Sequence, residues 1–147
     1  MQTFLPYFDY GRTAACLDRQ RLGKQRVENL QILKAIHDPD YGWQNHPAVN
    51  MWRGHPLSLV EYQRKICLAW TSRGYKDTCW EKTIHLMKSY GYMDHELNGL
   101  YTYSKPSWLL DDRFRESHQS NLVRKNPDHY RQFFPDVPDY IPYVWPV

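Results

Sequence analysis

The stretch Leu17–Ile36, LDRQRLGKQRVENLQILKAI, constrains the fold most, because its pattern is typical of one amphipathic helix. Its apolar side chains recur at near-helical spacing, with Val27 at the margin of the face formed by Leu22, Leu30, Leu33 and Ile36. A helix advances about 100° per residue, so Arg21 and Glu28 project in nearly the same direction, with Lys24 about 40° away. A single carboxylate among cations is typical of a site for a polyanion. Solvent-exposed helix faces show the same mixture of charges, so this pattern alone leaves both interpretations open.

The basic character of the chain is local. The 147 residues suffice for one domain, which we expect to span 1–147, and they carry 19 Lys and Arg against 16 Asp and Glu, a net charge of +3. The predicted helix alone holds the cations Arg19, Arg21, Lys24, Arg26 and Lys34 and the acids Asp18 and Glu28. This distribution favours a protein with one basic binding face over a generally basic one.

Several classes of protein do not fit this sequence. The three cysteines form no CxxC pair, and the seven histidines share no zinc-ligand spacing, so we expect no disulfide framework, no metal and no cofactor. The first ten residues, MQTFLPYFDY, have neither a basic start nor a long apolar run, so we expect no signal peptide and no membrane span.

The periodicity and the breaker residues predict an all-α fold, a compact single domain of about three to four main helices. The main helices are expected over Ala14–His37, Pro56–Arg73, Trp80–Tyr90 and Leu110–Lys125. A short helix should open at Pro47 with His46 at its cap. Residues 1–12 should form an extended arm, residues 92–106 an irregular stretch, residues 128–134 a short turn, and the proline- and aromatic-rich tail an extended cover over the body.

Three motifs carry a resemblance to a known family. The residues Leu17, Asp18, Arg19, Leu22 and Glu28 form an LDRxxL…E pattern, which precedes GWQNHP at 42–47 and RGY at 73–75. In this order they resemble the pyrimidine-dimer DNA glycosylases, the endonuclease V-like family. The ending LVRKNPDHYRQFFPDVPDYIPYVWP further resembles a bacterial and phage subgroup of that family.

The resemblance implies a mechanism and its catalytic residues. A backbone α-amine attacks C1′ of the damaged nucleotide, the base leaves, and an imine links protein and sugar. A glutamate on the first helix assists, and β-elimination then cuts the strand. Matching the motif makes Glu28 this glutamate. Because Gln2 is too bulky for the usual removal of methionine, the α-amine would be that of Met1. The implied fold is all-α, with the N-terminal arm threaded between helices.

The chemistry of the amine agrees with this assignment. An α-amine has an ordinary pKa of about 7.7–8.0 against about 10.4 for lysine, so far more of it is unprotonated at pH 7. Lys24 would serve as the nucleophile only if its pKa were strongly lowered.

Further side chains are candidates for binding DNA. They are Arg21, Lys24, Gln25, Arg26, Asn45, His46, Arg53, His118, Lys125 and Tyr130. Each of three candidates also has a structural interpretation. His46 is typical of a helix cap, although the resemblance favours a functional role. Arg53 is also typical of a surface charge, and His118 of an ordinary exposed histidine. Trp43, Trp52, Tyr130 and Phe133 are able to stack on DNA, although core packing is the expectation for the two tryptophans.

The family's prototype differs at some of these positions. Arg21 stands where the prototype has His, Arg26 where it has Tyr, and Val27 and Gln31 where it has Arg. The basic groups are thus redistributed, which leaves the lesion open.

We expect a monomeric, cytoplasmic, nucleoid-associated DNA glycosylase with lyase activity, whose partner is duplex DNA with damaged or modified pyrimidines. One alternative is the same fold acting on another modified or abasic site, and a second is a catalytically silent DNA-binding module. A more remote alternative is a nuclease that uses His46, His118 and Glu28.

Overall fold

The structure is a computed structural model that describes residues 1–99 and 104–146. Its helices are α1 (Tyr10–Cys16), α2 (Arg19–His37), α3 (Pro47–Asn50), α4 (Pro56–Ser72), α5 (Cys79–Ser89), α6 (Asp94–Leu97), the 3₁₀ helix η1 (Ser107–Leu110), α7 (Asp112–Lys125) and α8 (Pro127–Tyr130). The described ranges contain no strand, and the all-α prediction is confirmed. Residues 100–103 of the expected irregular stretch lie outside the described residues.

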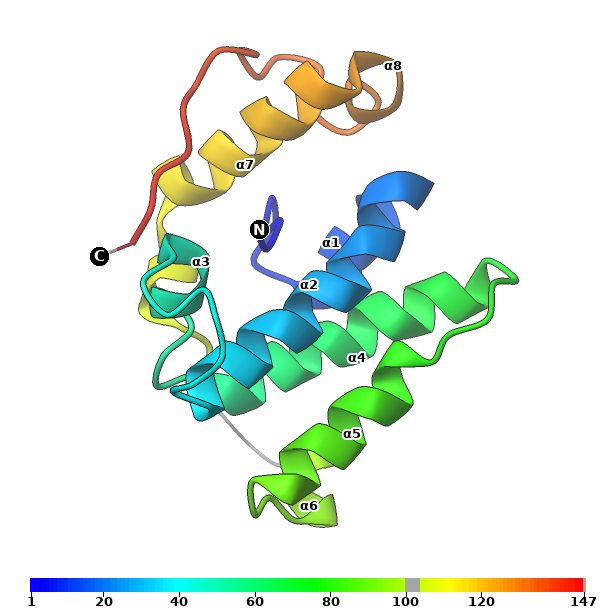
Figure 1. Cartoon of the computed structure of the whole chain (residues 1–147). Helices are drawn as coiled ribbons and strands as arrows, with labels where there is room; N and C mark the ends of the chain where they lie inside the picture. The colour runs from blue at the N-terminus through cyan, green and yellow to red at the C-terminus, as the bar shows by residue number, and fades with distance from the viewer. Residues whose placement is uncertain (100–103, 147) are drawn as a thin grey trace.

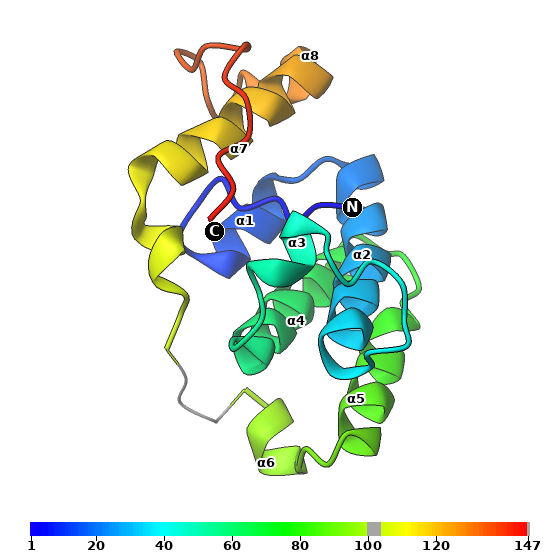
Figure 2. The same cartoon turned by 60° about the vertical axis from the view of Figure 1, so that its left-hand side comes forward.

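The helices form two layers with the N-terminal arm between them (Figure 1). α4 packs against α1 and α2, and α5 packs on the outer side of α2 and α4. α7 and α8 lie across the opposite side of the arm, and Figure 2 shows the same order from a second direction. No helix in the described part of the chain is long and apolar enough to cross a membrane.

The helix expected over Ala14–His37 is divided into two, and this part of the prediction is wrong. Leu17 and Asp18 adopt extended backbone angles between α1 and α2. Leu17 is completely buried there, and the Asp18 N–H donates to the hydroxyl of Tyr130 at 3.0 Å. That hydroxyl also donates to the Asp18 carboxylate, and Arg21 pairs with the carboxylate at 2.9 Å. Groups distant in the sequence therefore stabilise the break.

The buried face of α2 is more polar than the expected apolar face. Leu22 and Leu33 are buried as predicted, but Leu30 is only half-buried and Val27 is 44% exposed. The buried set is Leu22, Gln25, Glu28, Asn29, Ile32, Leu33 and Ala35. Three polar side chains enter this set because groups outside α2 bind them.

Other expectations about the local structure are confirmed. His46 caps α3, since its Nδ1 accepts the N–H of Ala48 at 3.0 Å and Pro47 follows as the first helical residue. Gly74 ends the turn after α4 with a φ of 93°, a backbone angle that favours glycine. The tail runs extended along α7, where Ser120 donates to the Pro138 carbonyl and Asn121 donates to that of Ile141 at 3.0 Å.

Candidate active site

The carboxamide of Gln25 holds the N-terminal arm in an extended conformation against α2. Its Oε1 accepts the N–H of Phe4 at 2.9 Å, and its Nε2 donates to the carbonyl of Gln2 at 2.8 Å. The same Nε2 donates to Asn29 Oδ1 at 2.8 Å, which fixes the orientation of the amide. One side chain thus pairs with two backbone groups of the arm, as the neighbouring strand of a sheet would.

Groups from three other parts of the chain complete the grip on the arm. His118 on α7 accepts the N–H of Leu5 on its Nδ1 at 3.0 Å. Trp52 Nε1 donates to Thr3 Oγ1 at 3.0 Å, and the Tyr62 hydroxyl donates to the carbonyl of Phe4. Because these donors and acceptors are buried, displacement of the arm would leave them without partners, at a cost of about 1–3 kcal/mol each.

Glu28 meets the arm at its first peptide bond. Its Oε2 accepts the N–H of Gln2 at 2.9 Å, while its Oε1 lies 3.6 Å from the Nζ of Lys24. The residue is only 8% exposed, whereas the side chain of Lys24 is 74% exposed. The carboxylate therefore lies at the base of a site whose cation faces solvent.

Met1 and Glu28 line the same pocket of about 430 Å³. The other lining residues are Gln2, Phe4, Gln20, Arg21, Lys24, Gln25, Lys125, Tyr143 and Trp145. The pocket thus combines an α-amine and a carboxylate with the cations of two helices and the aromatic end of the tail. A pocket with these groups is suited to an anionic ligand on which an amine can act.

His46 is electrostatically coupled to this pocket. Burial lowers its pKa, the positive charge of the Met1 amine lowers it further, and the negative charge of Glu28 opposes both effects. The ring also lies edge-on to Trp145, with centroids 6.1 Å apart. A residue predicted from the NHP motif thus lies within electrostatic reach of the two predicted catalytic groups.

The family model for pyrimidine dimer DNA glycosylase matches residues 1–83 of the chain. The chain belongs to this family. The comparisons find no match among curated proteins and none among solved structures. The matched part contains the arm, Gln25, Glu28 and His46, whereas Lys125, the only pocket residue contributed by α7 among the described residues, lies beyond it.

The structure brings some predicted residues to the pocket beside Met1 and Glu28 and places others elsewhere. Arg21, Lys24, Gln25 and Lys125 line it, although Arg21 is paired with Asp18. Asn45 lies on the loop before α3 and is not among the lining residues. Arg53 donates from its Nη2 to the Gln44 carbonyl at 2.9 Å and so braces that same loop.

Three predicted DNA contacts are not among the pocket's lining residues and are bound to other parts of the protein, so the proposed DNA-binding set does not include them. Arg26 projects toward the loop before α5, where its Nη1 pairs with Asp77 at 2.6 Å. Tyr130 is completely buried against Asp18. His118 is also completely buried, and burial lowers its pKa to about 3, so it is a neutral acceptor for the arm.

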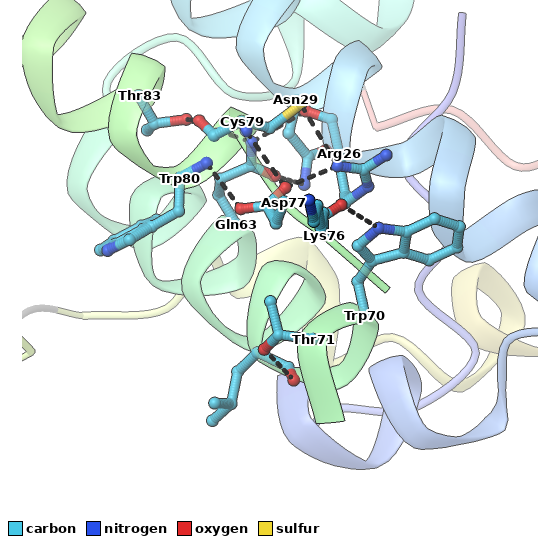
Figure 3. A network of polar contacts seen from close by, with 11 residues as sticks. Arg26, Asn29, Gln63, Trp70, Thr71, Lys76, Asp77, Cys79, Trp80 and Thr83 are labelled. Carbon is cyan, nitrogen blue, oxygen red and sulfur yellow. Dashed lines mark hydrogen bonds and ion pairs between the residues drawn. The ribbon is translucent and has the colours of Figure 1, made fainter. Parts of the chain in front are cut away.

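The surroundings of Arg26 form a closed network of polar groups, which Figure 3 shows. The carboxylate of Asp77 also accepts the N–H groups of Cys79 at 3.1 Å and Trp80 at 2.9 Å. The guanidinium lies 4.4 Å from the ring centroid of Trp70. An added Cβ at Gly23 would meet that ring at 3.0 Å, so glycine allows the indole to pack closely on α2. These contacts indicate a structural role for Arg26 in this glycosylase.

The sequence patterns did not identify some residues of the site. Tyr143 and Trp145 come from a tail in which aromatic residues are frequent, so no pattern distinguished them. Gln2 is 8% exposed and donates its backbone N–H to Glu28, but a single amide near a chain end has no periodicity. The one available signal was that Gln25 and Asn29 are spaced one helical turn apart on the side of Glu28.

Proposed function

We propose that this protein removes damaged or modified pyrimidines from duplex DNA, cyclobutane dimers foremost, and then cuts the strand at the abasic site. The observation that carries the proposal is the hydrogen bond of 2.9 Å between the Gln2 N–H and Glu28, which holds the start of the chain beside a carboxylate. Membership of the pyrimidine dimer DNA glycosylase family supports the class of substrate.

The α-amine of Met1 is the proposed nucleophile. At pH 7 about a tenth of an ordinary α-amine is unprotonated, against less than about a thousandth of an ordinary lysine. The amine attacks C1′, and the bond from C1′ to the base breaks as the base leaves. The bond from C1′ to the ring oxygen then opens, the oxygen takes up a proton, and the nitrogen loses one, which leaves an imine between Met1 and the sugar.

Glu28 is the proposed acid–base group for these transfers. The hydrogen bond from the Gln2 N–H to its carboxylate supports this role: Glu28 accepts the proton that the amine loses and delivers one to the ring oxygen. It then removes a proton from C2′ of the imine. The electrons of that bond form a C2′–C3′ double bond, and the 3′ phosphate leaves. Water finally hydrolyses the imine and frees Met1.

The DNA is held by the cations around the pocket. Lys24 and Lys125 are exposed and line it, and Arg21 contributes a further guanidinium, so phosphates of one strand bind here. His46 lies edge-on to Trp145 of the pocket, and in this proposal it contacts the sugar or the base edge together with Asn45 of the same loop. Since C1′ of a paired nucleotide is out of reach, the enzyme must open or kink the duplex.

The decisive test is reductive trapping with borohydride. The protein is incubated with a duplex that contains one thymine dimer, or one abasic site, and the imine is reduced to a stable amine link. We expect a covalent adduct from both duplexes. Digestion with trypsin and mass spectrometry should locate the sugar on the peptide that ends at Arg12, on the nitrogen of Met1. The intact mass of the protein verifies that Met1 is its first residue.

Two alterations test the assigned roles. Acetylation of the N-terminus should abolish the adduct, and Glu28→Gln should lower the single-turnover rate at least 100-fold, because acid–base groups contribute about 10²–10⁴-fold. An adduct that maps to Lys24 or that survives both alterations would refute the proposed site. An abasic-only adduct would identify the alternative substrate. Salt-sensitive binding without any adduct would identify a DNA-binding module.

A further inference from the structure

Trp43 combines an exposed indole with a backbone conformation that tryptophan rarely adopts. Its side chain is 53% exposed, although burial was the expectation for this residue. Its φ is 69°, the only positive value at a non-glycine position within residues 1–99 and 104–146. A bulky side chain is disfavoured in this left-handed region. Such strain persists only where the surroundings impose it, and it concentrates at functional sites.

The surroundings that impose this conformation lie on both sides of Trp43. Gln44 Nε2 donates to three carbonyls around the end of α2, those of Ala35 at 3.0 Å, Asp38 at 2.9 Å and Tyr41 at 2.8 Å. The carbonyl of Trp43 itself accepts the N–H of His46 at 3.0 Å. With Arg53 bound to Gln44 as well, the loop is fixed while the indole it presents is left in solvent.

The indole lies at the outer end of a row of rings that leads to the pocket. Trp43 stands edge-on to His46 with centroids 5.7 Å apart, and His46 stands edge-on to Trp145 at 6.1 Å. Trp145 lines the pocket together with Met1 and Glu28. Trp43 itself does not line the pocket, but only His46 separates its exposed indole from Trp145 at the pocket's edge.

We propose that Trp43 stacks on a base that loses its stacking neighbour when the duplex is opened or kinked at the lesion, and so determines preference for damaged over intact DNA. This inference rests on the proposed function. An unstacked base exposes an apolar face, and an aromatic side chain covers it whatever the base, because every base has a π-face. A side chain inserted in this way also holds the duplex kinked. A rigid loop suits this role, since little order is lost on binding.

The test compares Trp43→Gly, Trp43→Phe and Tyr140→Ala in the full chain. Glycine suits the left-handed backbone, so Trp43→Gly removes the ring without adding strain and its thermal midpoint should not fall. Phenylalanine keeps an aromatic face. Tyr140, which is 76% exposed and is not among the pocket's lining residues, controls for the loss of any surface aromatic group. The measurements are affinity for dimer-containing and intact duplexes, fluorescence of a 2-aminopurine beside the dimer, and the single-turnover trapping rate.

We expect Trp43→Gly to lower the preference for dimer-containing over intact duplex about tenfold or more, and to lose the quenching of 2-aminopurine. Stacking on one base accounts for an effect of about 5- to 150-fold of this kind. The salt dependence of binding should not change, because the phosphate contacts remain. Trp43→Phe should restore most of the preference, and Tyr140→Ala should behave as the wild type does.

Two outcomes would overturn the inference. In the first, Trp43→Gly keeps the wild-type preference and quenching. In the second, the preference falls only together with the thermal midpoint and phenylalanine restores neither, which would mean a structural role. A wild-type protein that forms no adduct and does not prefer dimers would instead refute the proposed function. Wild-type trapping together with an unaffected Trp43→Gly refutes the role of Trp43 alone.

Discussion

Arg26 and Glu28 are separated by one residue on α2, and each carries its charge into a different polar cluster. The Arg26 cluster comprises Arg26, Asn29, Gln63, Asp77 and Thr83, whose side chains bind mostly one another and nearby helix backbone (Figure 3). The arm cluster comprises Gln25, Glu28, Trp52, Tyr62 and His118, whose side chains bind the backbone or the Thr3 hydroxyl of residues 2–5.

The difference lies in what each cluster leaves accessible. Asp77 has a side chain only 4% exposed and donors on both carboxylate oxygens, although Asp77 also lines a separate pocket between α4 and α5. The second oxygen of Glu28 lies 3.6 Å from the Nζ of the exposed Lys24, and Glu28 lines the pocket that also contains Met1. A closed cluster joins helices to each other, whereas the open one fixes a chain terminus beside a reactive group. Neutralising the Asp77 carboxylate should therefore affect mainly stability, whereas neutralising the Glu28 carboxylate should affect mainly the reaction rate.

The largest effect is expected from neutralising each carboxylate in turn. Asp77→Asn removes one partner of a nearly buried ion pair and should lower the free energy of unfolding by about 3 kcal/mol, with little effect on the trapping rate at a temperature where the protein is folded. In Glu28→Gln the amide oxygen can still accept the Gln2 N–H, so the free energy of unfolding should fall by less than about 1 kcal/mol. The trapping rate, in contrast, should fall strongly. Urea denaturation and single-turnover trapping measure the two quantities. Equal stability losses would contradict the contrast between the clusters.

A second test uses the pH dependence of stability, which the arm cluster should dominate. Burial lowers the pKa of His118 to about 3, so the folded protein keeps the ring neutral where the unfolded chain, with a pKa of about 6.5, binds a proton. This contribution is complete above a pH of about 6.5 and is lost as the pH falls toward about 3. Between about pH 6.5 and pH 4.5 it should remove about 2–3 kcal/mol.

The variant His118→Asn isolates this effect. Its amide oxygen can accept the Leu5 N–H in place of Nδ1 but does not titrate in this range. The loss of ring packing against Phe114 lowers stability at every pH, so the readout is the slope of the unfolding free energy against pH. The slope should become shallower by about 1.4 kcal/mol per pH unit below about pH 6. An unchanged slope would show that another group takes up the proton.

The third test compares two buried glutamines that share Asn29 as a partner. Gln25 donates to Asn29 Oδ1 at 2.8 Å, and Gln63 accepts from Asn29 Nδ2 at 3.0 Å. Each change to alanine leaves buried polar groups without partners and should cost about 2 kcal/mol. Only Gln25→Ala loosens the arm that carries Met1, so it alone should slow trapping, by about tenfold, through misplacement of the amine. A similar slowing in Gln63→Ala would assign the effect to general destabilisation.

Local signals in the sequence predicted local structure well. The His46–Pro47 cap and the turn at Gly74 depend on a residue's own backbone preferences, so the sequence was sufficient to predict them. The break at Leu17 and Asp18 depends on Tyr130, more than a hundred residues away, and helical periodicity does not detect such a partner. For the same reason Gln25 and Asn29 could not be predicted as buried.

The candidate site was predicted differently from the fold. Charge patterns on α2 could not separate Glu28 from a solvent-exposed residue, and family resemblance selected it. The structure adds the contact with the Gln2 N–H, which no periodicity encodes. Arg26 shows the converse, since its charge and position favoured DNA binding while its partner, Asp77, lies in a loop that no pattern connected to it.

The smallest expected effect concerns Lys24, whose side chain is 74% exposed although its ion-pair partner, Glu28, is nearly buried. Such pairs contribute about 0–1 kcal/mol, so Lys24→Ala should leave the unfolding free energy within about 0.5 kcal/mol of the wild type. If Lys24 binds a phosphate, its removal should weaken the binding of intact and dimer-containing duplexes alike, by about threefold. It should also reduce the slope of the logarithm of the binding constant against the logarithm of the salt concentration by about one. Lys34→Ala is the matched control, because Lys34 is exposed on the same helix but lies over Tyr41 and lines a different pocket. Equal slopes in the two variants would show that Lys24 does not contact DNA and only forms the ion pair with Glu28.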